Sequence, residues 1–314
     1  MTECKCYPLI FETNLKTLVW GTERWVVSGV TGSESVVANG SLKGKTLTDV
    51  VNGDAEAMLG AAVVSKYGSQ LPLLAKIIDA RQDLSIQVHP NDEMAKREHG
   101  KMGKSEMWYI IDADPGARLL VGFSRSISAE EYRQRVADGT ITEVLASHPV
   151  KPGDVFYLPA GRVHAIGGGI RLAEIQQSSD VTYRIYDYGR LGLDGKPREL
   201  HTDLAAQAIN FTVQPDYLTH YPHDKDAVNK VLDTPYFRIN QMTISAPLSR
   251  NLMAEKSFVI VVSMSGGCRV TLHDGGEYVD LPPFTSCFIP AIAAAYDVSP
   301  LDASQPAQVL EAMI

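Results

Sequence analysis

The sequence contains no run of about eighteen apolar residues, so it has no segment that would cross a bilayer as a helix. Its first residues, MTECKCYPLIFETNLKTLVWG, also lack the positively charged start, the apolar stretch and the small-residue cleavage site of a signal peptide. We therefore expect a cytoplasmic protein with no membrane partner.

An excess of basic residues is also absent. The chain carries 29 Lys and Arg against 37 Asp and Glu, which gives a formal net charge of -8. Binding to a polyanion requires a net or local excess of cations, and no run of the sequence supplies one. We expect no nucleic acid partner. A small anionic ligand remains possible where a few cations converge.

Cysteine is scarce, and the spacing of the four cysteines does not suggest a set of disulfide bonds. Cys4 and Cys6 form a terminal CxC, whereas Cys268 and Cys287 stand among apolar, strand-like residues. A disulfide-rich secreted domain is therefore not expected, and the pattern fits a reducing compartment. The CxC has no second pair nearby that would complete a metal site, so we interpret it as two ordinary thiols.

Most of the sequence has the pattern of short strands separated by turns. Runs such as YFRINQMTI and FVIVVSMSGGCRVTLHDGGEYVDLPPFTSCFIP in the C-terminal part, and GDVFYLPAGRVHAIGGGIRLAEIQQ before it, are β-rich and punctuated by Gly and Pro. The polar stretch PHDKDAVNKVLDTP between them is typical of a linker. This predicts a mainly β protein with two barrel-like halves.

Helical patterns interrupt the first half. GKTLTDVVNGDAEAMLG and LPLLAKIIDA show apolar residues at helix-like intervals. After Ser128, Glu131 stands at the spacing of a capping box, which predicts a helix that begins there. We therefore expect the first half to be enlarged by helical insertions.

One polar stretch, LSIQVHPNDEMAKREHGKMGKSEMWYIID, is either a metal site or a solvated loop. Residues two apart in a strand face the same side, so Gln87 and His89 point together. His164 follows a Pro-x-Gly turn, and Glu106 opens a strand. Taken singly, each of these residues is more often a structural or surface residue. Together they favour a site for zinc, with iron or manganese also compatible.

The second half offers a weak internal repeat of this pattern. Ala295 stands at the same offset from Pro290 as His164 does from Pro159. One half therefore has a histidine where its counterpart has none, which predicts that the second half binds no metal.

GDVFYLPAGRVH matches the second motif of the cupin superfamily up to its histidine, although the Asn expected after it is replaced by AIGGG. QVH resembles the start of the first motif, with the expected glutamate displaced to Glu106. The runs PLLAKIIDARQDLSIQVHPND, GKSEMWYII and SSDVTYRIYDYGR resemble the type I mannose-6-phosphate isomerases, in particular the short bacterial form. The resemblance implies two cupin-like (jelly-roll) β-barrels: a catalytic domain at 1–225 with helical insertions, and a metal-free domain at 226–314.

The resemblance also implies an activity: the interconversion of mannose 6-phosphate and fructose 6-phosphate through an enediolate, with Zn²⁺ as cofactor and a hexose 6-phosphate as partner. By position, the zinc ligands fall on Gln87, His89, Glu106 and His164. The catalytic positions fall on Arg184, Lys104 and Glu174, and the candidates for binding the phosphate are Lys101 and Arg184.

Alternatives remain open at this point. Another metal cupin, such as an iron dioxygenase or a different sugar isomerase, uses the same ligand types on another substrate. A non-catalytic sugar-binding cupin is the third possibility. From the residues alone, Arg184 forms an ion pair with Asp187 at least as readily as it serves catalysis. The sequence does not indicate the native metal, the catalytic base, the preferred sugar or the oligomeric state.

Overall fold

The computed structural model describes residues 6–314, so Cys4 of the CxC lies outside the described residues. The chain forms two compact units. Unit 2 comprises Leu15–Arg24 and Lys76–Thr219, and unit 1 comprises the segment up to Asn14, Trp25–Ala75 and His220–Ile314. The residues between 25 and 75 therefore group with the C-terminal part. A division at residue 225 into a catalytic and a metal-free domain remains a prediction.

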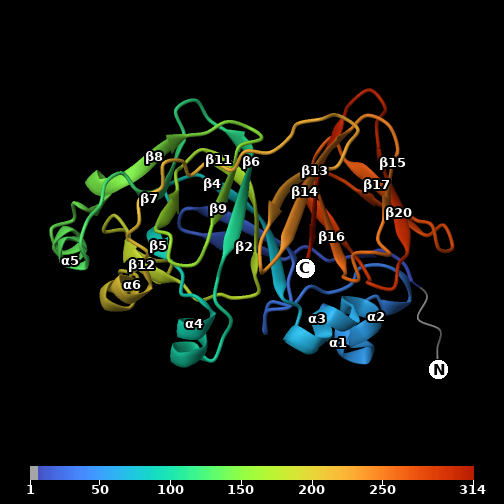
Figure 1. The fold of residues 1–314 in the computed structure, drawn as a ribbon, viewed down its shortest axis with the longest axis horizontal. Coiled ribbons are helices and arrows are strands. Elements are labelled where there is room, and N and C mark those ends of the chain that lie inside the picture. The colour runs from blue at the N-terminus through green and yellow to red at the C-terminus, as the bar shows by residue number, and fades with distance from the viewer. Residues whose placement is uncertain (1–5) are drawn as a thin grey trace. The chain divides into compact units, whose positions relative to one another are not determined.

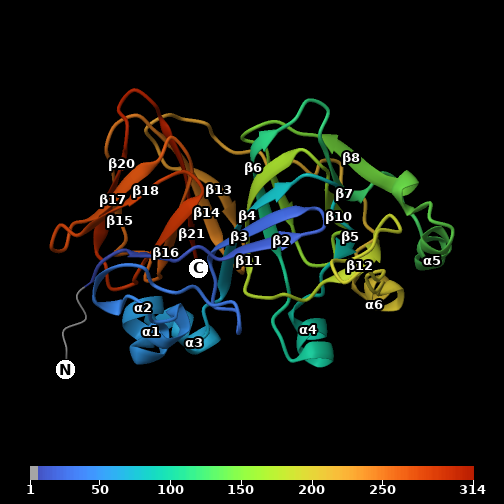
Figure 2. The same ribbon diagram turned by 180° about the vertical axis from the view of Figure 1, so that it is seen from behind.

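Unit 2 is built mainly from two sheets, whose strands are labelled in Figures 1 and 2. One has the order β2-β3-β4-β11-β6-β9 and the other the order β12-β5-β10-β7-β8. The first sheet consists of β2 (Leu15–Leu18), β3 (Gly21–Val27), β4 (Leu73–Ala80), β11 (Ile170–Gln177), β6 (Glu106–Ala113) and β9 (Val155–Leu158). The second consists of β12 (Tyr183–Tyr186), β5 (Ile86–Val88), β10 (His164–Ile166), β7 (Arg118–Phe123) and β8 (Leu145–Pro149).

Helices interrupt the strands of unit 2, as the sequence predicts. The helix α5 (Ala129–Ala137) begins at Ser128, whose side chain accepts a hydrogen bond from the backbone N–H of Glu131. The sequence did not predict α4 (Asp92–His99), which occupies the polar stretch after His89. Asn91 caps its first turn and Gly100 ends it in the left-handed conformation. The remaining helices are η2 (Ile141–Val144) and α6 (Thr202–Ala208).

Unit 1 also contains two sheets, in the orders β1-β19-β16-β21-β14-β13 and β15-β20-β17-β18. The first consists of β1 (Leu9–Ile10), β19 (Thr285–Ile289), β16 (Val259–Ser265), β21 (Ala307–Met313), β14 (Arg238–Ile244) and β13 (Asn229–Asp233). The second consists of β15 (Leu248–Asn251), β20 (Ala295–Pro300), β17 (Cys268–Leu272) and β18 (Tyr278–Leu281). Its helices are η1 (Gly40–Leu42), α1 (Leu47–Gly53), α2 (Ala55–Leu59) and α3 (Ala61–Tyr67).

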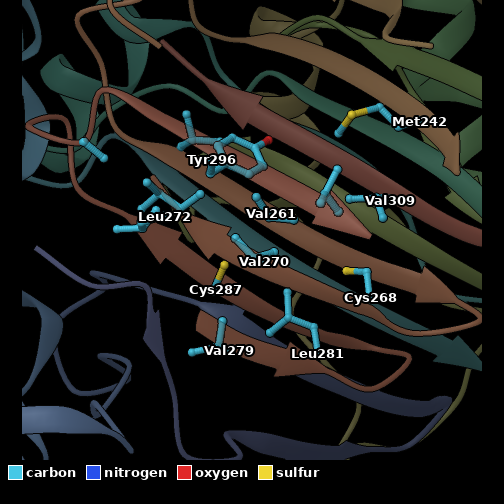
Figure 3. Close-up of a cluster of buried hydrophobic side chains, with 14 of the residues drawn as sticks. Met242, Val261, Cys268, Val270, Leu272, Val279, Leu281, Cys287, Tyr296 and Val309 are labelled. Atoms are coloured by element: carbon cyan, nitrogen blue, oxygen red, sulfur yellow. The ribbon is translucent and has the colours of Figure 1, made fainter. Parts of the chain in front are cut away.

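The two sheets of unit 1 pack an apolar core between them. Val261 and Cys287 of one sheet lie in the same buried cluster as Val270 and Cys268 of the other (Figure 3). Both cysteines are free thiols with no exposed surface. They serve here as small apolar core residues.

Two sequence-based predictions of local structure were wrong. LPLLAKIIDA does not form a helix: it contains β4, whose residues are almost all buried. A strand covered on both faces has no apolar-polar alternation, so its apolar run is easily mistaken for a buried helix. The stretch PHDKDAVNKVLDTP is not simply a linker, because it contains β13, which pairs with the following strand β14.

The prediction of a mainly β protein is confirmed. Each unit contributes two of the sheets, and none of them closes into a barrel within residues 6–314. None of the helices in the described residues is long and apolar enough to span a membrane.

Candidate metal centre

Three strands of unit 2 place a row of polar side chains on one face of the five-stranded sheet. Gln87 of β5 pairs in register with His164 of β10 on one side and with Arg184 of β12 on the other. Residues directly opposite each other in neighbouring strands project their side chains to the same face. Gln87 therefore lies between the predicted ligand His164 and the predicted catalytic Arg184.

The six-stranded sheet of unit 2 supplies a second polar row. Glu106 pairs with Gln176, and two residues further along the same strands Trp108 pairs with Glu174. The Trp108 ring meets His164 edge-on, with the ring centroids 5.1 Å apart. This contact joins the polar rows of the two sheets, so the side chains of both rows meet inside unit 2.

His89, Glu106 and His164 form the centre of this cluster. The Nε2 atom of His89 lies 3.5 Å from Glu106 Oε2, and that of His164 lies 3.2 Å from Glu106 Oε1. One potential ligand atom from each residue lies within 4.8 Å of the others, and each residue is at most 1% exposed. The structure thus brings together three of the four residues predicted as ligands.

The two histidines have defined proton positions. His89 Nδ1 lies 2.9 Å from the Val181 carbonyl oxygen, and His164 Nδ1 lies 2.8 Å from that of Arg162. A carbonyl oxygen only accepts hydrogen bonds, so each Nδ1 carries the proton and each Nε2 is left as an acceptor. Burial and the Lys104 charge lower the pKa of His164 to about 3 and that of His89 well below its usual value. Both rings are therefore neutral, as metal ligands must be.

Glu106 is the part of the cluster that the protein itself does not satisfy. Neither of its oxygens accepts a hydrogen bond of ordinary geometry from residues 6–314, although both are buried. Lys104 Nζ lies 2.6 Å from Oε2 and forms a buried ion pair with it. Burial and the nearby Glu174 raise the pKa of Glu106 to about 7. Two imidazole Nε2 atoms beside a buried carboxylate are a donor set that fits a divalent cation.

Gln87 lies next to this group but presents its amide nitrogen to it. Its Nε2 is 3.2 Å from His164 Nε2, as a hydrogen-bond donor to the histidine lone pair. For Gln87 to act as a fourth ligand, its amide must rotate so that the oxygen replaces the nitrogen. Gln87 thus lies beside the three ligand residues, but its amide is oriented to donate a hydrogen bond to His164.

Two buried lysines border the cluster, and the sequence predicted only one of them. Lys104 Nζ lies 3.0 Å from His89 Nε2. Lys76 of β4, which was not predicted, lies 2.8 Å from Glu174 Oε1, while Trp108 Nε1 donates to the other Glu174 oxygen at 2.9 Å. Burial alone would raise the pKa of Glu174, but the Lys76 and Lys104 charges outweigh it and lower the pKa to about 2.

The predicted phosphate-binding cations lie outside this cluster. Arg184 is half-buried, and its Nη1 donates to the Glu199 carbonyl oxygen at 2.9 Å. Its Nε is buried and has no hydrogen-bond partner within the described residues. Lys101 is half-exposed and forms an ion pair with Asp180 at 2.6 Å.

Comparison with known proteins identifies the family. The family model "Phosphomannose isomerase type I, catalytic domain" matches residues 18–114. The chain is 37% identical over 291 residues to mannose-6-phosphate isomerase ManA of Bacillus subtilis, a match that covers 87% of this chain and 89% of the relative. It is 33% identical to a mannose-6-phosphate isomerase of Streptococcus mutans, over 88% of this chain and 92% of that one. The chain belongs to the mannose-6-phosphate isomerase family.

A solved structure supports the same assignment. The crystal structure of the mannose 6-phosphate isomerase from Bacillus subtilis superimposes with a TM-score of 0.87 at 28% identity, and the match covers 98% of this chain and 100% of that one. The predicted enzyme class, mannose-6-phosphate isomerase, is thereby confirmed over a different metal cupin or a non-catalytic sugar-binding protein. The matched residues 18–114 include Gln87, His89, Lys104 and Glu106.

Proposed function

We propose that this mannose-6-phosphate isomerase family member uses a zinc ion, held by His89, Glu106 and His164 with Gln87 as the fourth ligand, to interconvert mannose 6-phosphate and fructose 6-phosphate. The observation that carries the proposal is the buried group of two imidazole Nε2 atoms and one carboxylate, whose potential ligand atoms lie within 4.8 Å of one another. Two imidazoles and a carboxylate are a ligand set that zinc prefers, and zinc bound there would polarise the sugar carbonyl and stabilise an enediolate.

Moving the carbonyl between C1 and C2 requires that a proton leaves one carbon and is returned to its neighbour. We assign this transfer to Lys104 in its neutral form, after it has released a proton to solvent, because its side-chain nitrogen is buried against the ligand atoms of His89 and Glu106. Glu174 was the other predicted proton carrier. With a pKa of about 2, Glu174 is a weak base near neutral pH. Its hydrogen bond with Lys76 favours a supporting role, in which it binds the charged Lys76.

Arg184 is assigned to the negative charge of the substrate. It lies on the same sheet face as Gln87, and its buried Nε has a donor available. A guanidinium in that place stabilises an enediolate oxygen or pairs with a phosphate through two hydrogen bonds. Lys101 joins Arg184 as the second phosphate candidate. Its exposed ion pair with Asp180 is easily exchanged for a phosphate oxygen.

The wider assignments remain part of this proposal. They are two cupin-like barrels with catalytic residues in 1–225, a hexose 6-phosphate as substrate, no nucleic acid or membrane partner, and a cytoplasmic location. The β-rich units support the first of these, the family supports the hexose 6-phosphate, and the acidic net charge disfavours a nucleic acid partner.

The proposal is tested by a coupled assay of mannose 6-phosphate conversion to fructose 6-phosphate. The purified protein is measured as isolated, after chelation, and after the return of zinc, iron or manganese. We expect activity to disappear with the chelator and to return with zinc. The His164→Ala variant should neither bind zinc nor turn over substrate.

A matched control is His273→Ala, which removes an exposed histidine of unit 1 that pairs with Asp297. This variant should keep both its metal content and its activity. Full activity in the metal-free protein, or recovery with iron alone, would contradict the zinc proposal. Zinc binding without turnover would contradict the catalytic assignment.

A further inference from the structure

Asp187 is a buried carboxylate just beyond β12, and two arginines converge on it. Arg190 donates to its Oδ1 from Nη2 at 2.7 Å, and Arg198 donates from Nε to Oδ2 at 2.6 Å and from Nη2 to Oδ1 at 2.5 Å. Burial raises the pKa of Asp187, but the hydrogen bonds from Arg198 and Arg190 outweigh it and keep the pKa below its usual value. Asp187 is therefore ionised, and it fixes both ends of the loop 188–198.

The segment that follows Arg198 forms the immediate frame of Arg184. The Glu199 carbonyl oxygen accepts the Arg184 Nη1 hydrogen bond at 2.9 Å. The backbone N–H of His201 donates to the Arg184 carbonyl oxygen at 2.8 Å, and the Arg184 N–H donates to His201 Nδ1 at 3.1 Å. The position of the Arg184 guanidinium thus depends on where residues 198–201 lie.

The loop itself adds little apolar packing to this segment. Its tip is a short turn in which Leu191 bridges Pro197, and the side chains of Leu191 and Leu193 are 53% and 73% exposed. The loop therefore gains little from apolar burial, and polar contacts attach it. These are the Asp187 ion pairs at its base and the hydrogen bond that Arg190 Nη1 donates to the Asp83 carbonyl oxygen at 2.6 Å. Without the carboxylate, the guanidinium groups of Arg190 and Arg198 would also repel each other.

We infer that Asp187 is a positioning residue for Arg184, acting through Arg198 and the Glu199 carbonyl. The inference rests on the proposed role of Arg184 in binding the substrate's negative charge. It also replaces the simple Arg184–Asp187 ion pair that the sequence left open, because the hydrogen bonds that Asp187 accepts from arginines in the described residues come from Arg190 and Arg198.

The test is a double-mutant cycle on the isomerase activity. Arg184→Ala should lower kcat/KM by about 10²–10³-fold, the usual effect of removing a donor to a developing oxyanion. Asp187→Asn should lower it by about tenfold, mainly through kcat, because the arginine remains but is poorly placed. In the double variant, the Asp187 substitution should add no further loss, because the two residues act as one unit.

A second variant and two further measurements separate positioning from folding. Arg198→Lys keeps the charge but loses the bidentate pair, so it should reproduce the loss seen with Asp187→Asn. Metal content and the midpoint of thermal unfolding are measured for each variant. Asp280→Asn, which breaks the two-bond pair with Arg269 in unit 1, is the matched control and should leave kcat/KM unchanged.

The outcomes distinguish this inference from the proposed function. If Arg184→Ala lowers kcat/KM but Asp187→Asn lowers it equally in both backgrounds, Asp187 acts by another route and the positioning inference is wrong. Full activity of both Asp187→Asn and Arg198→Lys would overturn it as well. If Arg184→Ala itself has no effect, the proposed role of Arg184 fails, and with it the reason for positioning.

Discussion

Unit 1 and unit 2 each bury a glutamate with no exposed surface between two sheets, and the two glutamates are treated in opposite ways. In unit 1, Glu311 accepts two hydrogen bonds from Arg250, at 2.9 and 2.7 Å, one from the Tyr296 hydroxyl at 2.6 Å, and one from Asn240 at 2.7 Å. In unit 2, Glu106 accepts none of ordinary geometry from the described residues. The first network is complete without a ligand, whereas in the second the Lys104 ion pair is the close contact of Glu106 with a cationic side chain, and we propose that a metal ion completes it.

The hydrogen-bond partners of a buried carboxylate indicate whether it has a structural or a functional role. A buried carboxylate with a full set of donors belongs to the architecture, because its desolvation is offset by its partners. A buried carboxylate that faces two lone pairs is unfavourable by itself, and a protein keeps such an arrangement for a function. Tyr296, labelled in Figure 3, comes directly after Ala295, which opens β20 as His164 opens β10. Arg250 and Tyr296 thus occupy the interior of unit 1 and bind Glu311 there.

The largest expected effect comes from Glu106→Gln. A neutral amide is a poor replacement for an anionic ligand, so we expect loss of bound metal and a fall in kcat/KM on the order of 10³-fold or more. The metal-free variant should be less stable than the metal-free parent, because the buried Lys104 keeps its charge but loses the carboxylate oxygen 2.6 Å away. Metal analysis, the coupled assay and urea unfolding in chelator check both parts. If Glu106→Gln bound as much metal as the parent, Glu106 would not be a metal ligand, and the two glutamates would not differ in function.

The reciprocal change, Glu311→Gln, should leave metal content and kcat/KM unchanged and lower the free energy of unfolding by about 3 kcal/mol. The reason is that Arg250, whose side chain is only 15% exposed, keeps its charge but loses its anionic partner. Urea unfolding measures the loss, and the coupled assay on the folded variant measures function. Loss of activity in a fully folded variant would show that unit 1 contributes more than structure.

The structure brings together the two histidines that the sequence motifs indicate, whereas several of the other buried charges were not indicated by the sequence. The QxH pair and the Pro-x-Gly-x-x-His motif are local patterns, and both histidines lie where these patterns place them. Lys76 was missed because it stands inside an apolar run that resembles a helix, and only the pairing of β4 beside β11 brings it to Glu174. Arg250 and Glu311 are 61 residues apart in the chain, so no local pattern indicates their contact.

The helix α4 is another feature that the sequence did not predict. The polar stretch between His89 and Glu106 is compatible with a solvated loop, but Asn91 and Gly100 cap a regular helix within it. That helix separates the two motif residues in sequence while β5 and β6 bring them together in space. The displaced glutamate therefore follows from an insertion between strands.

Bound zinc should stabilise the folded protein only when Glu106 of unit 2 is intact, whether or not Glu311 of unit 1 is. At a free zinc concentration of about 100 times Kd, ligand binding to the folded state adds about 2.7 kcal/mol to its stability. We expect this gain in the parent and in Glu311→Gln, and not in Glu106→Gln. Thermal unfolding in chelator and in buffered zinc measures it. An equal zinc-induced gain in all three proteins would place the binding site elsewhere.

The smallest expected effect is that of Tyr296→Phe, which removes one of the donors to Glu311 and keeps the ring in the core. Hydrogen bonds to charged groups contribute about 1.5–3 kcal/mol, and the remaining donors from Arg250 and Asn240 still serve the carboxylate, so we expect a loss near 1.5 kcal/mol. Urea unfolding measures this, with kcat/KM unchanged. A loss as large as that of Glu311→Gln would mean that the network acts as a single unit. A negligible loss would mean that Arg250 and Asn240 alone satisfy Glu311, and that the contrast with Glu106 rests on those two residues.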